Sequence, residues 1–81
     1  MAFEPSGEEI DVLACFLHGE NVRLATEDIQ LSLPVIKDIV YLLFHHRYLK
    51  NVDGSIHFNK DDIEDTPLII TAKGHRFLVG H

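Results

Sequence analysis

The fold is decided by one stretch, PVIKDIVYLLFHHRYL, which spans residues 34–49. Its apolar residues recur at the spacing of a helix with one buried face, and they are Ile36, Ile39, Val40, Leu43 and Phe44. Pro34 suits the first helical turn, where its missing N–H costs nothing. We therefore predict a helix over residues 34–47 that packs one face inward and exposes the other.

Two helices are predicted before this one. The sequence SGEE, which begins at Ser6, has the S-x-x-E form of a capping box, so a first helix should run from there to about Leu17. Thr26 is followed by two acids and predicts the N-cap of a short second helix that ends near Leu31. Residues 32–34 would then form the turn, and this order of helices is typical of a helix-turn-helix unit.

The residues after the long helix predict a β-hairpin. Residues 49–52 favour a strand, and Asp53-Gly54 is a strong turn signal. Residues 55–58 alternate polar and apolar side chains, as a returning strand would. The acidic stretch at 59–66, NKDDIEDT, is then predicted to be an exposed loop, whereas residues 20–24 are predicted to connect the first two helices.

The C-terminal residues predict a last strand and a last helix. Residues 67–71, PLIIT, are mostly apolar, and Thr71 is placed to cap a helix that follows it. Gly74 in that helix is expected to permit close packing. The predicted elements make one α+β domain over residues 1–81, since a chain of this length is too short for two domains.

Charge is distributed unevenly along the chain. The net charge is −6, from 7 Lys and Arg and 13 Asp and Glu. Positive charge is concentrated in residues 32–51 and 67–81, while residues 1–31 and 52–66 are acidic. This distribution is compatible with a local basic patch on an acidic body, and also with no patch at all, because the cations are few.

Composition also bounds the class of protein. A hydrophobic content of 46% favours a folded domain over a disordered one. No apolar run reaches the roughly 20 residues of a membrane span, the first residues do not resemble a signal peptide, and Cys15 has no partner for an internal disulfide. We therefore expect a cytoplasmic protein with no membrane partner. Its small core also favours a homodimer.

Three segments carry a resemblance to a known family: VYLLFHHRYL at 40–49, NVDG at 51–54 and IITAKGHRFL at 69–78. Together they resemble a winged helix-turn-helix domain, most similar to small MarR-like and phage-repressor-like regulators of prokaryotes and archaea. Arg47 stands where that family usually has glycine. The resemblance implies a three-helix core, a β-hairpin wing and a C-terminal helix. It further implies that helix 34–47 enters the major groove of DNA as the recognition helix.

The resemblance also implies which residues contact DNA. They are Ser32, Pro34, Val35, Lys37, Asp38, Tyr41, His45 and Lys50. Lys37 and Tyr41 lie one turn apart and form the favoured pair, because lysine can bind guanine or phosphate and tyrosine can donate to phosphate. The acids of residues 61–65 would repel phosphate from the wing.

The sequence contains neither a catalytic motif nor a metal-binding motif. No nucleophile elbow, phosphate loop or paired-carboxylate spacing is present in the sequence. The six histidines lack ligand-like spacing, and residues 61–65 lack the spaced acids of a calcium loop. We therefore expect no enzymatic activity, no cofactor and no metal, with a composite zinc site as the alternative.

Two functional hypotheses follow. The first is a dimeric transcription regulator that binds double-stranded DNA through helix 34–47. The second is a winged-helix module that contacts another protein and does not bind DNA. The acidic first helix and acidic wing favour the second, and the basic residues of helix 34–47 favour the first.

Overall fold

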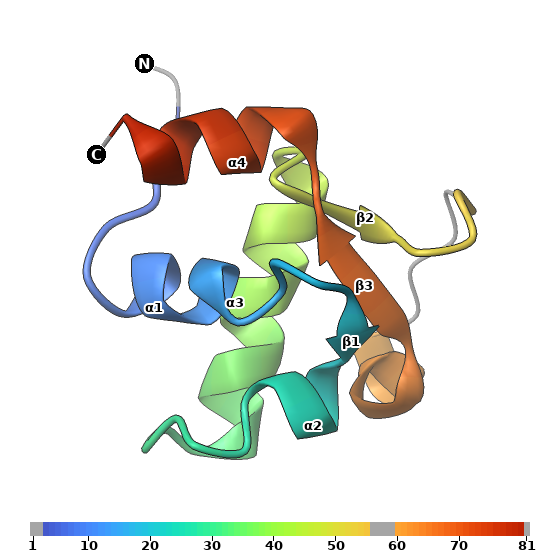
Figure 1. Ribbon diagram of the computed structural model, residues 1–81. Coiled ribbons are helices and arrows are strands. Elements are labelled where there is room, and N and C mark those ends of the chain that lie inside the picture. The colour runs from blue at the N-terminus through green and yellow to red at the C-terminus, as the bar shows by residue number, and fades with distance from the viewer. Residues whose placement is uncertain (1–2, 56–59, 81) are drawn as a thin grey trace.

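Helix α3 (Leu33–His45) is the central element of the computed structural model, in which residues 3–55 and 60–80 are described. It runs behind α1 in Figure 1, with the sheet to one side and α4 across its C-terminal end. Its buried residues are Ile36, Val40 and Leu43, all of which belong to the predicted apolar face. The predicted long helix is therefore confirmed, although it ends two residues earlier.

The chain leaves α3 through a Schellman motif, in which a left-handed residue closes the helix. The N–H of Tyr48 donates to the carbonyl of Leu43 at 2.8 Å, and the N–H of Arg47 donates to Phe44 at 3.1 Å. Arg47 has a φ of 67°, which is a conformation that glycine adopts without strain. The motif turns the chain directly into the strand that follows.

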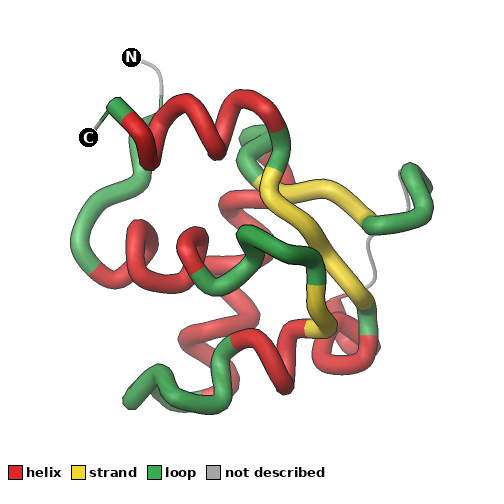
Figure 2. Tube along the Cα trace, viewed as in Figure 1, coloured by secondary structure: helices red, strands yellow, loops and turns green. Residues whose placement is uncertain are grey.

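Three short strands form one antiparallel sheet. They are β1 (Glu20–Asn21), β2 (Leu49–Asn51) and β3 (Pro67–Ile70), in the spatial order β1-β3-β2. Leu49 is paired with Ile70 in the register of β2 and β3. Figure 2 shows these strands beside the helices. In the described residues the fold is thus α+β, with four α-helices and a three-stranded antiparallel sheet.

Helix α1 (Glu8–Ala14) is shorter than predicted: it ends at Ala14, whereas the sequence predicted a helix that reaches about Leu17. One half of the predicted capping box is present, since the carboxylate of Glu9 accepts the N–H of Ser6 at 3.0 Å. The other half is absent: Gly7 occupies the N-cap position and provides no side-chain cap.

Helix α2 (Val22–Ala25) has its N-cap, Asn21, five residues before the predicted cap Thr26, and it lies within the stretch that we predicted to be a connector. The side chain of Asn21 caps it by accepting the N–H of Leu24 at 3.3 Å. Thr26 follows the helix instead of starting it, and its buried hydroxyl donates to the carbonyl of Val22 at 2.7 Å. The prediction of a helix beginning at Thr26 was therefore wrong.

The acidic stretch predicted to be an exposed loop contains the 3₁₀ helix η1 (Lys60–Asp65). Ile63 is completely buried in the core, and this single apolar residue anchors the segment beside α2, α3 and β1. The loop prediction was therefore wrong. Of the returning strand predicted at 55–58, Ser55 lies outside any strand and the other residues lie outside the described part of the chain.

Helix α4 (Ala72–Val79) begins as predicted. The hydroxyl of Thr71 accepts the N–H of Gly74 at 3.1 Å, which confirms the predicted cap. The same hydroxyl donates to the carbonyl of Arg47 at 2.6 Å and so joins the starts of α4 and β2. Within the described residues, no helix combines the length and apolarity needed to cross a bilayer.

The N-terminal segment packs against the end of α3. The ring of Phe3 stacks on His46 with the centroids 4.5 Å apart, and the carbonyl of Phe3 accepts the hydroxyl of Tyr48 at 3.2 Å. Lys73 completes this cluster, because its Nζ donates to the carbonyl of His46 at 2.9 Å and lies 4.4 Å from the centroid of the Tyr48 ring.

Gly74→Ala should destabilise the protein. A Cβ at this buried position would lie 2.7 Å from both the Cγ1 of Ile70 and the carbonyl oxygen of Tyr48. Overpacking of this kind costs about 1–3 kcal/mol and outweighs the better helix propensity of alanine. We expect a lower urea midpoint for Gly74→Ala than for Gly80→Ala, whose added Cβ would meet its nearest atom at 3.3 Å. Equal midpoints would show that α4 can move away from β3 at little cost.

Arg47→Gly should stabilise the protein, because glycine relieves the left-handed backbone of the Schellman motif. The expected gain in the free energy of unfolding is about 0.5–1 kcal/mol, since the relieved strain exceeds the added entropy of the unfolded chain. Urea unfolding at an unchanged m-value measures this gain. Arg47→Ala is the matched control, because it removes the same side chain and retains the strain. A similar gain in stability for Arg47→Gly and Arg47→Ala would show that the lost charge, and not the relieved backbone strain, causes it.

Candidate nucleic-acid interface

A hollow of about 710 Å³ lies between the C-terminal half of α3, strand β2 and the residues that follow β2. Its described lining residues are Tyr41, Phe44, His45, Arg47, Leu49, Lys50, Gly54, Ser55 and Thr71. None of these lining residues is acidic, whereas two are permanent cations and one is a histidine. We call this feature the basic hollow.

Helix geometry places two of the lining side chains. Tyr41 and His45 lie one turn apart on the exposed side of α3, where residues at this spacing are neighbours. Their rings are nearly parallel, with an interplanar angle of 12° and a centroid separation of 6.1 Å. Both rings therefore line the hollow from the same helix.

The two cations are placed by the turn into β2. Arg47 occupies the left-handed position of the Schellman motif and lines the hollow from the end of the helix. Lys50 lies in β2 between two buried residues and is itself exposed, as strand alternation requires. The hydrogen bonds from Thr71 to the Arg47 carbonyl and from Lys73 to the His46 carbonyl hold this backbone in place.

Lys37 is not part of the basic hollow. Its Nζ lies 3.0 Å from the Oε1 of Glu64, and its side chain is only 22% exposed. The other carboxylate oxygen of Glu64 lies 3.5 Å from Arg23, which also contacts Asp65 at 3.1 Å. Lys37 and Tyr41 lie one turn apart on α3, but only Tyr41 lines the hollow, whereas Lys37 is paired with Glu64 of η1.

The pKa of Glu64 is lowered from its ordinary value of 4.5. The hydrogen bond from Lys37 is the largest cause, and the positive charges of Lys37 and Arg23 contribute further. Glu64 therefore stays ionised and keeps its hold on both cations through mildly acidic pH.

The remaining predicted contacts lie on the N-terminal half of α3. Ser32 is the N-cap and makes no side-chain cap, and Pro34 lies exposed in the first turn. Asp38 is exposed and acidic. Val35 belongs to a different hollow of about 500 Å³, which it shares with Ile39 and the start of α1. The structure therefore brings Tyr41, His45 and Lys50 together and leaves Val35 on another flank of the helix.

Sequence reasoning did not assign Arg47, Phe44 or Ser55 to the site. Arg47 was expected to lie away from the DNA, because it ends the helix. Its three-residue spacing from Lys50 across the start of a strand was the signal that could have identified it. Among the described residues, no group of three or more His, Cys, Asp or Glu side chains is arranged to hold a metal ion.

Glu64→Gln should change how stability depends on pH. Because the folded-state pKa of Glu64 is lowered, its carboxylate stabilises the fold above pH 4.5 and loses this effect as pH falls through the folded-state value. The variant should therefore be less stable than the wild type near neutral pH, and the two should converge as the pH falls below the lowered folded-state pKa of Glu64. Urea midpoints across this range measure the difference, with exposed Glu27→Gln as the control. A deficit that is constant with pH would contradict the ion-pair explanation.

The site thus combines an open basic hollow with a neighbouring ion-pair cluster, and neither contains a catalytic arrangement among the described residues. Its cations can bind anionic oxygens, and its aromatic rings can stack or donate hydrogen bonds. Comparison with known proteins finds no matching family model, no matching curated protein and no matching solved structure.

Proposed function

We propose that this protein is a winged-helix transcription regulator that binds double-stranded DNA through α3 and the basic hollow. One observation carries the proposal: Arg47 and Lys50 converge with Tyr41 and His45 on one open surface whose described lining contains no acid. On an acidic protein of net charge −6, such a surface is where a polyanion would be least repelled.

The chemistry of the hollow suits a phosphodiester backbone. Arg47 offers a planar fork that matches phosphate oxygens, and Lys50 offers a mobile point charge. Tyr41 can donate its hydroxyl to phosphate, and His45 adds a donor that strengthens when protonated. Phe44 and Leu49 supply an apolar floor that fixes the polar groups around it. Contacts of this kind position DNA and do not by themselves select a sequence.

The arrangement of elements supports the winged-helix assignment. The chain order α1-β1-α2-α3-β2-β3 and the strand order β1-β3-β2 are compatible with that fold. In this reading α3 is the recognition helix, and the residues after β2 form the wing. The exposed Asp38 would then approach base edges in the major groove, while the basic hollow, Tyr41 included, would receive the adjacent backbone.

A protein-binding role is the second candidate. It is favoured by two apolar side chains at the exposed start of α3, Leu33 at 38% and Val35 at 40% exposure. Val35 also borders the hollow at the start of α1, where Glu8 and Glu9 add negative charge. Such a surface would suit a basic, amphipathic partner, or a second copy of this chain in a homodimer.

Duplex binding with single-cation variants tests the proposal. Arg47→Ala and Lys50→Ala should each weaken binding about tenfold, because each removes a phosphate contact and about 0.9 from the salt slope. Arg76→Ala is the matched control: it removes one exposed cation that does not line the hollow. We expect a clearly smaller loss for this control, measured by fluorescence anisotropy on genomic fragments.

Three equal losses would show that only the net charge matters and would contradict the assigned surface. A wild-type protein that binds no duplex even at low salt would contradict DNA binding altogether. The exposed apolar start of α3 would then be the better-supported interface.

A further inference from the structure

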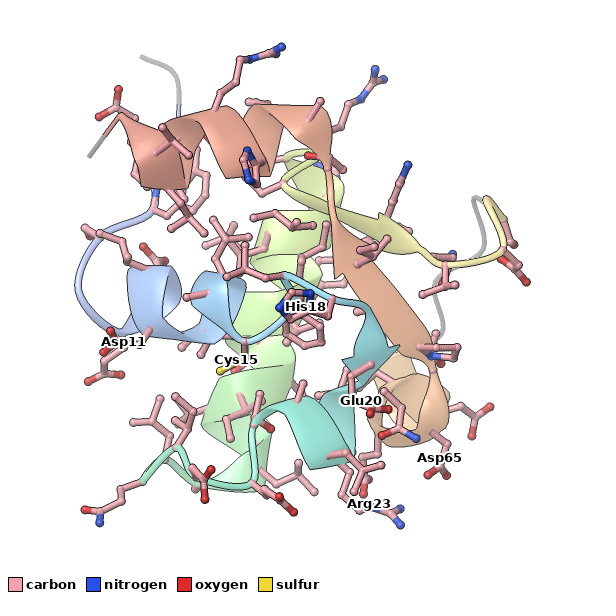
Figure 3. All side chains as sticks on the ribbon, in the orientation of Figure 1. Asp11, Cys15, His18, Glu20, Arg23 and Asp65 are labelled. Atoms are coloured by element: carbon pink, nitrogen blue, oxygen red, sulfur yellow. The ribbon has the colours of Figure 1, made fainter. Side chains whose placement is uncertain are left out.

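The 3₁₀ helix η1 holds an acidic side chain against the recognition helix. Buried Ile63 anchors η1 in the core, and the next residue, Glu64, contacts cations from two other helices. Its Oε1 lies 3.0 Å from Lys37 of α3, and its Oε2 lies 3.5 Å from Arg23 of α2. Figure 3 shows Arg23 and Asp65 at one corner of the molecule, where α2 and η1 meet. We call Lys37, Arg23, Glu64 and Asp65 the acidic clamp.

The acidic clamp adjoins the basic hollow. Lys37 lies one helical turn before Tyr41, so the two side chains are neighbours on the same flank of α3. Tyr41 in turn lines the hollow together with Arg47 and Lys50. If Lys37 were free, the cationic surface would therefore extend along α3 toward its N-terminus. Glu64 prevents this extension.

The carboxylate of Glu64 occupies the place that a phosphate oxygen would take. Carboxylate and phosphate bind ammonium and guanidinium groups through the same charge-assisted hydrogen bonds. The Lys37–Glu64 pair is partly open to solvent, with side-chain exposures of 22% and 27%. Ion pairs at such positions are weak, so a strong polyanion that approaches α3 can compete for the cations.

From these contacts we infer that Glu64 acts as an internal competitor of DNA phosphate, which limits the affinity of α3 for the duplex until a phosphate displaces it from Lys37. This inference rests on the proposed DNA-binding function and adds to it a regulatory role for η1. The bound state would have Lys37 on phosphate, while Asp65 retains Arg23.

Glu64→Gln is the direct test, because glutamine keeps the shape and the hydrogen-bond acceptor and removes the charge. The variant should bind duplex about three- to tenfold more tightly than wild type, because Lys37 no longer has to leave a charged partner before it reaches phosphate. Glu27→Gln is the matched control, since it removes one exposed acid outside the acidic clamp. It should reproduce only the small gain from the change in net charge.

A double-mutant cycle isolates the role of Lys37. In the wild type, Lys37→Gln should weaken DNA binding only modestly, because the gain from the Lys37–phosphate contact is offset by the loss of the Lys37–Glu64 pair. In the Glu64→Gln background, the same substitution should weaken binding more, because no such pair is lost, and it should remove the gained affinity. A non-zero coupling between the two positions is a result that a general charge effect would not produce.

The outcomes separate this inference from the proposed function. If duplex binding depends on Arg47 and Lys50 and Glu64→Gln equals Glu27→Gln, the competitor role is wrong while DNA binding stands. If no variant binds duplex, the proposed function fails and the competitor role fails with it.

A second measurement needs no variant and so does not depend on the folding of Glu64→Gln. In the wild-type protein, the carbon-13 shift of the Glu64 carboxylate should move toward that of an unpaired glutamate as duplex is added. A bound complex in which this shift is unchanged would show that Lys37 stays on Glu64, and it would overturn the inference.

Discussion

The reversal of the chain at the end of α3 is the constraint on which the rest of the structure depends. Arg47 takes a left-handed backbone so that β2 can begin immediately after the helix. Side chains from the other end of the fold then bind the exposed carbonyls of this junction: Thr71 binds that of Arg47 and Lys73 that of His46. Gly74 lets α4 approach the carbonyl of Tyr48. One junction therefore joins the helical core, the sheet and α4, and it also fixes the direction of two hollow-lining residues.

The charges of the molecule are organised around the same helix. Its C-terminal end meets cations of the basic hollow, whereas its middle meets the carboxylate of Glu64. Because the buried residue Ile63 anchors η1 in the core, the adjacent Glu64 carries negative charge to a place beside the basic hollow. Ile63 packs η1 into the core, and the adjacent Glu64 gives η1 its electrostatic effect on α3.

Local signals predicted part of this fold well. The apolar period of α3 and the cap at Thr71 depend on residues within a few positions of one another, so a single segment carries enough information. The position of the second helix was predicted wrongly, because Asn21 and Thr26 are competing cap residues of similar strength. Only tertiary packing decides between them. The burial of Ile63 was not predictable, since one apolar residue among acids has no period. The α+β fold class could be predicted from the kinds of element in the sequence, but the exact bounds of those elements could not.

The candidate site was harder to predict for the same reason. Tyr41, His45 and Lys50 were identified because they lie on exposed positions of elements with a clear pattern. The ion pair of Lys37 joins residues far apart in the chain, and no local pattern indicates it. The place of Arg47 in the hollow was not predicted, because it depends on a backbone turn whose usual residue is glycine.

The stacking of Phe3 on the end of α3 has a consequence for the order of folding. The hydrogen bond from Tyr48 to the Phe3 carbonyl spans 45 residues, so the chain must close a long loop before this contact can form. The Schellman turn at the end of α3, which receives Phe3, is closed by hydrogen bonds between residues close in sequence and can form first. The N-terminal segment therefore docks late on a finished surface, and during transient opening it is among the first parts to leave.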